Sequence, residues 1–318
     1  MEITDEIKEK LQLLNDKYSA LGQDLNSYLD GLLYADTVKY WDYIQVDTLL
    51  SLQKPRTSFP DEVIFIMYHQ ITELYFKLAL REFEQIGNEK DISGDFFLAR
   101  VARINRYFES LTKSFEIMVQ GMEKEQFLKF RMSLLPASGF QSAQYRLIEM
   151  ASTDFINLVH KDVRSNYDGS EHIETLFEHI YWKEGATELA SGKKTLTLIE
   201  FENRYKDEFI AFAKDVKKTN LWRVFSRLDP ADQKRPEIIR AMKLNDVNVN
   251  INWPLMHYKS AVKYLHMAPE DIAATGGTNW QKYLPPRFQK RIFYPELWSE
   301  KEMNEWGKSW VEEVLANG

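Results

Sequence analysis

Apolar residues recur at intervals of three and four along most of this 318-residue chain, which is the period of an α-helix. The clearest case is the segment 62–88, where one side of a helix would carry Ile64, Met67, Ile71, Leu74 and Leu78. Glycine and proline are also scarce, at 13 and 10 residues. Average usage would give roughly 40 in a chain of this length. The sequence therefore predicts an all-α fold.

Further segments carry the same spacing. We expect helices over residues 2–30, 62–88, 95–121, 123–135, 140–161, 170–184, 194–217, 253–267 and 298–315. The polar stretch after residue 217, with Pro230 and Pro236, is not assigned a helix. Because no repeat, low-complexity tract or linker is apparent, residues 1–318 are expected to form a single large helical domain. Residues 1–30 are expected to form an N-terminal arm used between subunits.

The composition excludes several kinds of protein. The chain has no cysteine, so disulfides, thiolate metal sites and a thiolate nucleophile are ruled out. The net charge of −7 argues against a nucleic-acid partner, since phosphate binding requires clustered Lys and Arg. The apolar runs are too short to cross a membrane, and the N-terminus lacks a signal-peptide pattern. We expect a soluble cytoplasmic protein.

Any transition metal would need ligands from His, Asp, Glu or Tyr, and there are six histidines. The HExxH motif is absent, and no histidine has Glu three residues before it, as a di-iron helical bundle requires. His160-x-Asp162 and His172-x-Glu174 have the spacing of a facial triad. That spacing is common by chance, and a solvated helix face explains both pairs more simply.

Two other histidines lie among apolar residues. His69 follows Phe65 by one turn, so the two side chains share a helix face. Such an imidazole either satisfies a buried partner or lines a pocket. His257 follows Trp253 by one turn and has the apolar surroundings that an axial haem ligand needs. A packed core histidine is the alternative for each.

One basic residue stands out in an apolar segment. Arg131 follows Phe127 by one turn, and a guanidinium held there requires a carboxylate. The carboxylate could come from an internal ion pair or from a ligand. The loop Thr275-Gly276-Gly277 offers a hydroxyl and backbone amides, but it lacks the pattern of a phosphate-binding loop.

Taken together and in order, these segments resemble the tryptophan 2,3-dioxygenase family. The Ser-Gly-Phe-Gln-Ser and Phe-x-x-x-His-Gln-x-x-Glu-Leu runs are the most distinctive. The matching segments are Phe65-Ile66-Met67-Tyr68-His69-Gln70 with Glu73-Leu74-Tyr75-Phe76-Lys77, Phe127-x-x-Phe130-Arg131, Ala137-Ser138-Gly139-Phe140-Gln141-Ser142-x-Gln144-Tyr145-Arg146-x-x-Glu149, His257, and Thr275-Gly276-Gly277.

The resemblance implies an all-helical homotetramer that binds one haem b per subunit. It implies an enzyme that opens the indole 2,3 bond of L-tryptophan with O2 and yields N-formylkynurenine, the first step of the kynurenine route. By motif, His257 resembles the axial ligand of the iron. His69 resembles the distal histidine that meets the indole N–H, and Phe65 the ring that packs on the indole.

The resemblance also implies roles for the remaining positions. Arg131 would take the substrate carboxylate, with Phe127 on the pocket wall beside it. The substrate would also contact Ile66, Met67 and Tyr68, which lie between Phe65 and His69. Ser138 and Gly139 resemble the loop over the distal haem face. Thr275 resembles the hydroxyl that meets the amino-acid end of the substrate, and Tyr40 a tyrosine that completes a neighbouring subunit's pocket.

Two other functions remain open on the sequence alone. The first is a haem monooxygenase that acts on another indole derivative, which oxygen stoichiometry would distinguish. The second is a non-enzymatic protein that binds haem or tryptophan, which the absence of turnover would distinguish.

Overall fold

The computed structural model describes residues 3–35, 39–134, 141–186, 193–265 and 286–308. Every regular element in these ranges is a helix, and Val159 and Ile180 form an isolated antiparallel β-bridge. The all-α prediction is therefore confirmed. The chain divides into two compact units, Met1–Gln53 and Lys54–Gly318, which are described separately.

The first unit consists of helices that bury none of their side chains. They are α1 (Asp5–Ser19), α2 (Leu25–Tyr34), α3 (Tyr40–Tyr43) and α4 (Val46–Leu50). The prediction of one helix over residues 2–30 was wrong. Gly22, just after the end of α1, adopts a φ of 69°, a left-handed conformation that a continuous helix cannot contain, and the Asp24 side chain caps the start of α2.

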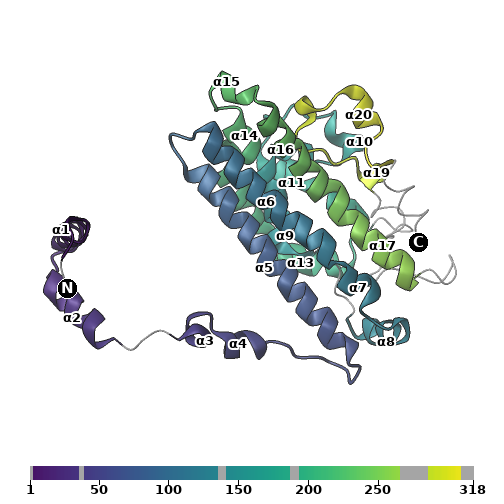
Figure 1. Cartoon of the computed structure of the whole chain (residues 1–318). Coiled ribbons are helices and arrows are strands. Elements are labelled where there is room, and N and C mark those ends of the chain that lie inside the picture. Colours follow the sequence, from purple (N-terminus) through teal and green to yellow (C-terminus); the bar gives the residue numbers. More distant parts are fainter. Residues whose placement is uncertain (1–2, 36–38, 135–140, 187–192, 266–285, 309–318) are drawn as a thin grey trace. The chain divides into compact units, whose positions relative to one another are not determined.

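The second unit is built around long helices that lie side by side (Figure 1). The helix α5 (Asp61–Asn88) packs against α6 (Gly94–Ser114) and α9 (Ala143–Ser152), and α6 packs against α16 (Pro236–Val247). Their shared core is strongly aromatic and almost inaccessible to solvent; it includes Phe76, Phe97, Phe108, Ile104, Leu111 and Met242. Burial of each of these side chains stabilises the packed helices by about 1.5–3 kcal/mol.

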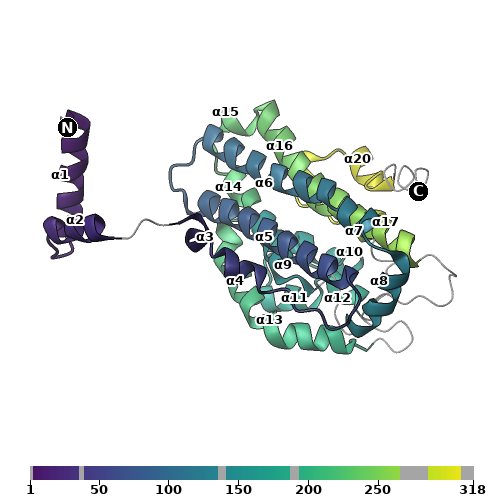
Figure 2. The ribbon, with the colours of Figure 1, turned by 60° about the horizontal axis from the view of Figure 1, so that its bottom comes forward.

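A near-continuous rod of helix runs beside α6 (Figures 1 and 2). It begins with α16, passes through one π-helical segment, η5 (Asn248–Asn252), and continues as α17 (Trp253–Leu265). The Trp253 amide donates to the Asn248 carbonyl five residues earlier, which is the π-helical pattern. The rod carries His257 into the same region as the C-terminal end of α6.

Shorter elements complete the second unit. Before α9 come α7 (Glu116–Gln120), α8 (Lys124–Phe130) and η1 (Arg131–Leu134). Between α9 and α16 come η3 (Phe155–Leu158), α10 (Lys161–Arg164), α11 (Ile173–Glu178), α12 (Tyr181–Gly185), α13 (Leu196–Asp215), η4 (Val216–Lys218), α14 (Leu221–Phe225) and α15 (Pro230–Gln233). After α17 come α19 (Pro286–Gln289), η6 (Pro295–Leu297) and α20 (Glu300–Asn304).

A buried ion network fixes α9 in place. Glu149 lies between two arginines, with Arg146 at 2.9 Å and Arg291 at 2.7 Å, and it accepts a hydrogen bond of 2.6 Å from the Tyr181 hydroxyl. Gln144 donates to the Glu73 carbonyl of α5 at 2.9 Å. The motif that contains Gln144, Arg146 and Glu149 therefore holds the scaffold together.

Several predicted helices are shorter than expected. Residues 95–121 divide at Phe115, where the Thr112 and Ser114 hydroxyls donate to carbonyls of the preceding turn and compete with the helix ladder. Residues 140–161 leave the α-helix after Ser152, and residues 170–184 divide near Ile180 at the β-bridge.

The stretch after residue 217 was wrongly left without a helix. It contains α14, α15 and α16, and Pro230 and Pro236 begin two of them, because proline at the first helical turn gives up no hydrogen bond. No helix within the described ranges is both long and apolar enough to cross a bilayer.

Candidate functional site

Two histidines from distant parts of the sequence come close together in the second unit. His69 lies in the middle of α5, and His257 lies one turn into α17. The charge of His69 is among the influences that lower the pKa of His257, so the two rings share one region of space. Helix packing brings them there, because α5 and the rod ending in α17 both pack on α6.

The His257 ring is oriented and kept neutral. Its Nδ1 lies 3.2 Å from the Trp253 carbonyl oxygen, and since a carbonyl only accepts, Nδ1 carries the proton. Burial lowers the pKa of His257 to about 4, so the imidazole is uncharged near neutral pH. Phe115 and Trp253 pack against it, each with a ring-centroid distance of 4.7 Å. Nε2 therefore keeps a lone pair that can bind a metal.

His69 has the same internal arrangement. Its Nδ1 lies 2.7 Å from the Phe65 carbonyl, and its ring packs on the Phe65 ring at 4.1 Å. Burial lowers its pKa, although more than a third of the residue's surface is exposed. The imidazole is therefore packed among protein atoms on one side and faces open space on the other. Nε2 of His69 is thus available to accept a hydrogen bond from a ligand.

Aromatic rings connect the two histidines. Tyr68 packs near His69 at 6.4 Å and on Phe115 at 5.6 Å, and Phe115 in turn packs on His257. The Tyr68 hydroxyl donates to the Leu111 carbonyl at 3.2 Å, and the residue is only 3% exposed. Tyr68 therefore belongs to the core behind the two histidines.

Arg131 supplies a positive charge beside this region. It is the first residue of η1, directly after Phe130, and its Nη1 is buried with no hydrogen-bond partner within the described ranges. Phe127 and Phe130 pack on Phe65 at 6.3 and 5.8 Å, which places the guanidinium's segment next to the His69 face. Burial lowers the pKa of Arg131. A buried donor without a partner is costly, so this arginine is suited to an anionic ligand.

The side chains of this region suit a metal cofactor in which an organic ring supplies most of the metal's ligands. The described residues contain no group of three or more His, Asp and Glu side chains that could hold an ion. A single neutral imidazole within an aromatic wall fits a haem iron, which needs one or two axial protein ligands. His257 meets that requirement, and the aromatic rings beside it offer flat apolar surface.

The remaining predicted residues are distributed as follows. Ile66 is half-buried and Met67 is 39% exposed. Tyr40 is 72% exposed and belongs to the first unit. The remaining three, Ser138, Gly139 and Thr275, lie outside the described residues.

Sequence reasoning did not assign Phe115 or Phe130 to the site, and their signal was weak. Phe115 lies within the helix expected over residues 95–121, where its apolar side chain does not stand out from its neighbours. The back-bonding hydroxyls of Thr112 and Ser114, which end α6 just before it, are the local signal that could have identified it.

Comparison with known proteins gives one consistent family. The model of the tryptophan 2,3-dioxygenase family matches residues 32–257, a range that includes His69 and Arg131 and ends at His257. A tryptophan 2,3-dioxygenase of Bacillus thuringiensis subsp. konkukian is 28% identical over 286 residues, which cover 84% of this chain and 92% of that protein.

Two further relatives carry the same name. The protein of Bradyrhizobium diazoefficiens is 26% identical over 283 residues, covering 83% of this chain and 92% of that protein. The protein of a Ruegeria species is 38% identical over 118 residues, covering 36% of this chain and 42% of that protein. Because the family model spans well over half of the sequence, the chain belongs to the tryptophan 2,3-dioxygenase family.

Proposed function

We propose that this protein opens the indole 2,3 bond of L-tryptophan with O2 and yields N-formylkynurenine, the first step of the kynurenine pathway. One observation carries the proposal above the rest. His69 on α5 and His257 on α17 each keep Nε2 available, and Arg131, whose buried Nη1 has no hydrogen-bond partner among the described residues, lies beside the aromatic wall they share.

His257 holds haem b through Nε2 in this proposal. The hydrogen bond from Nδ1 to the Trp253 carbonyl fixes the tautomer and the ring plane, which is the usual way a ligating histidine is oriented. When bound, the haem iron supplies the activation of O2. Ser138 and Gly139 are proposed to be among the residues that would hold the haem.

Arg131 and Thr275 position the amino-acid end of the substrate. The guanidinium pairs with the carboxylate in a bidentate way, which satisfies its buried Nη1. Phe65 and Phe127 form an apolar wall for the indole ring. Their combined effect is orientation, which contributes about 7–11 kcal/mol to catalysis in favourable systems.

His69 holds the indole N–H. Its Nδ1 donates to the Phe65 carbonyl, so Nε2 accepts a hydrogen bond and does not compete for the carboxylate. The lowered pKa keeps His69 in this accepting form near neutral pH. Its role is to orient the ring, and proton removal is not required of it.

The first unit is proposed to act between subunits of a homotetramer, with Tyr40 completing a neighbouring pocket. Tyr40 and the adjoining Trp41 are 72% and 52% exposed within one chain. Aromatic side chains of this size are stabilised when a second surface covers them.

The test uses haem-loaded, reduced protein with L-tryptophan and 18O2, followed by mass spectrometry of the product. Two labelled oxygen atoms in one product molecule are expected. One labelled atom would indicate the monooxygenase alternative. Bound haem without any product would indicate the non-enzymatic alternative. The variant His257→Ala is expected to lose haem, and an unchanged haem spectrum would contradict the axial assignment.

A further inference from the structure

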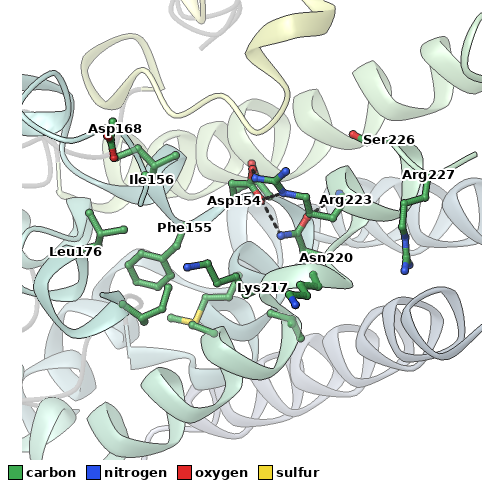
Figure 3. Close-up of a pocket in the computed structure, with 17 residues that line it drawn as sticks. Asp154, Phe155, Ile156, Asp168, Leu176, Lys217, Asn220, Arg223, Ser226 and Arg227 are labelled. Atoms are coloured by element: carbon green, nitrogen blue, oxygen red, sulfur yellow. Dashed lines mark hydrogen bonds and ion pairs between the residues drawn. The ribbon is translucent and has the colours of Figure 1, made fainter. Parts of the chain in front are cut away.

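A cavity lies in the same unit, formed by elements that carry none of the catalytic candidates. It has a volume of about 600 Å3 and lies between η3, α11, the end of α13 with η4, and α14 (Figure 3). Cavities of about 300–1,000 Å3 with apolar walls and a few polar groups are typical of small-molecule sites.

The floor of this cavity is apolar. It is formed by side chains that are largely or fully removed from solvent: Met150, Phe155, Ile173, Leu176 and Ala213. Ile156 and Val216 extend the same apolar surface towards the opening. A ligand with a hydrocarbon or aromatic body would bury its apolar surface against this floor.

The rim of the cavity is cationic. Lys217, Lys218 and Arg227 are exposed, and none of their side chains has a hydrogen bond or ion pair within the part of the chain that the structure describes. Figure 3 shows Phe155 and Leu176 on one side of the cavity and Arg227 on the other. The cavity therefore places unneutralised positive charge opposite apolar surface, in a chain whose net charge is −7.

The other charged groups at the cavity are already occupied. Arg223 pairs with Asp154 at 2.6 Å, and the buried Asn220 donates to the same carboxylate at 3.1 Å (Figure 3). Asp168 accepts hydrogen bonds from Ser170, which lower its pKa. These contacts leave Lys217, Lys218 and Arg227 as the groups that select the charge of a ligand.

We propose that this cavity binds an amphipathic organic carboxylate, with its apolar body on the Phe155–Leu176 floor and its carboxylate between Lys217 and Arg227. An apolar cation would meet like charge at the rim, and a small inorganic anion would leave the floor uncovered. The site is separate from the His69 and His257 region, and it does not depend on the proposed dioxygenase activity.

The test is isothermal titration calorimetry of the full-length protein with octanoate, hexanoate, acetate and octylammonium. Octanoate is expected to bind at one site, roughly fifteenfold tighter than hexanoate, since it has two more methylenes and each buried methylene strengthens binding about fourfold. Acetate and octylammonium are expected to bind at least tenfold more weakly than octanoate. Equal binding of octanoate and octylammonium would overturn the role of the rim.

Variants separate this cavity from other binding surfaces. Lys217→Glu with Arg227→Glu is expected to weaken octanoate binding at least tenfold. The control, Lys90→Glu with Lys234→Glu, makes the same change in net charge at exposed positions outside the cavity, and it is expected to leave binding unchanged. Equal effects of the two pairs would overturn the proposal, because they would reduce it to general electrostatics.

Two single variants complete the design. Ile156→Thr removes apolar surface and is expected to weaken octanoate binding a few-fold without affecting acetate, while circular dichroism verifies the fold. Arg131→Gln is expected to leave octanoate binding unchanged. Loss of octanoate binding in Arg131→Gln would place octanoate in the His69 region and overturn the proposal.

Discussion

His69 and His257 are built alike although they come from different helices. Each imidazole binds the carbonyl four residues before it in its own helix, Phe65 for one and Trp253 for the other. Each helix therefore fixes its own tautomer without help from a side chain elsewhere. The sequence identified both residues as candidates, but only packing shows that they share one region of the protein.

Arg131 is the residue whose replacement most directly tests the substrate's carboxylate. Arg131→Gln is expected to weaken L-tryptophan binding about tenfold to a hundredfold, since a hydrogen bond to a charged group contributes about 1.5–3 kcal/mol. Binding of tryptamine, which lacks the carboxylate, is expected to change less than threefold. Dissociation constants from spectral titration of the haem-loaded protein measure both.

The conservative change Arg131→Lys provides the matched control. It keeps the charge but loses the bidentate geometry, so an intermediate loss is expected for L-tryptophan. An equal loss of tryptamine and L-tryptophan binding in Arg131→Gln would contradict the carboxylate role.

Burial of His257 makes the stability of the haem-free protein depend on pH. The pKa of His257 is about 4 in the folded chain and near its ordinary 6.5 in the unfolded chain, so between these values only the unfolded chain takes up the proton. The contribution is present above pH 6.5 and is lost as the pH falls towards 4. The loss is about 3 kcal/mol, or 1.4 kcal/mol per pKa unit.

Asp246 opposes this effect, so the measurement compares two proteins. Burial raises the pKa of Asp246 to about 6, and its stabilising contribution therefore grows as the pH falls. The difference in unfolding free energy between the wild-type chain and His257→Gln removes the Asp246 effect. Urea unfolding from pH 7 to pH 4 is expected to show that difference falling by about 3 kcal/mol. A constant difference would mean that His257 is not desolvated.

At the scale of elements, periodicity predicted the long helices and missed the points where they end. The apolar spacing predicted α5 as a helix, but the side it marked is not the buried one: Met67, Ile71, Leu74 and Leu78 are 39–48% exposed. The buried face of α5 instead carries Tyr68, Thr72, Phe76, Ala79, Phe83 and Ile86. The break at Phe115 depends on the hydroxyls of Thr112 and Ser114, which donate to carbonyls of the preceding turn. The spacing of apolar residues contains no information about such hydrogen bonds. Pro236 begins α16, although proline in a polar stretch was read as a sign of no helix.

The candidate site was predictable in its residue types and not in its arrangement. The sequence marks Arg131 as a cation among apolar residues, but only the packing of η1 shows that its Nη1 is buried without a hydrogen-bond partner among the described residues. The shared environment of His69 and His257 depends on contacts between elements far apart in sequence, which no local pattern contains.

The start of α6 depends on close contact with α15. The Gly94 amide donates to Asp232 at 3.0 Å, and a β-carbon at Gly94 would lie only 2.3–2.5 Å from the Asp232 carboxyl atoms. Gly94→Ala is therefore expected to lower the unfolding free energy by about 1–3 kcal/mol, the usual cost of overpacking. Urea unfolding of Gly94→Ala, of Asp232→Ala and of the double variant measures the coupling between the two positions.

Asp232→Ala removes the carboxyl group that the new methyl would meet. In that background Gly94→Ala is expected to cost less, with a coupling energy of at least about 0.5 kcal/mol. Additive effects would show that the contact with Asp232 is not what requires glycine.

At the scale of the whole molecule, the first unit presents a run of exposed apolar side chains. Leu32, Leu33 and Tyr34 are 73%, 74% and 81% exposed, and α1 to α4 bury no side chain of their own. Contiguous exposed apolar residues mark association surfaces in soluble proteins. The proposed homotetramer provides such a surface.

Replacement of that surface is expected to change the assembly. Leu32→Glu with Leu33→Glu should shift the protein to smaller species in sedimentation velocity, because burial of two carboxylates opposes association. Asn26→Glu, at an exposed polar position of the same helix, is the control and is expected to leave the sedimentation coefficient unchanged. A shift of equal size in both proteins would point to net charge instead.

The π-helical segment η5 has a consequence for the direction in which His257 points. Successive residues of an α-helix are rotated by about 100° around its axis, so one additional residue in a single turn turns everything downstream by that angle. The extra residue between Asn248 and Trp253 thus determines on which side of α17 the His257 imidazole lies. Without it, an otherwise regular rod of the same composition would place His257 about a quarter-turn around the helix axis from its present side, away from the Phe115 ring that packs on it.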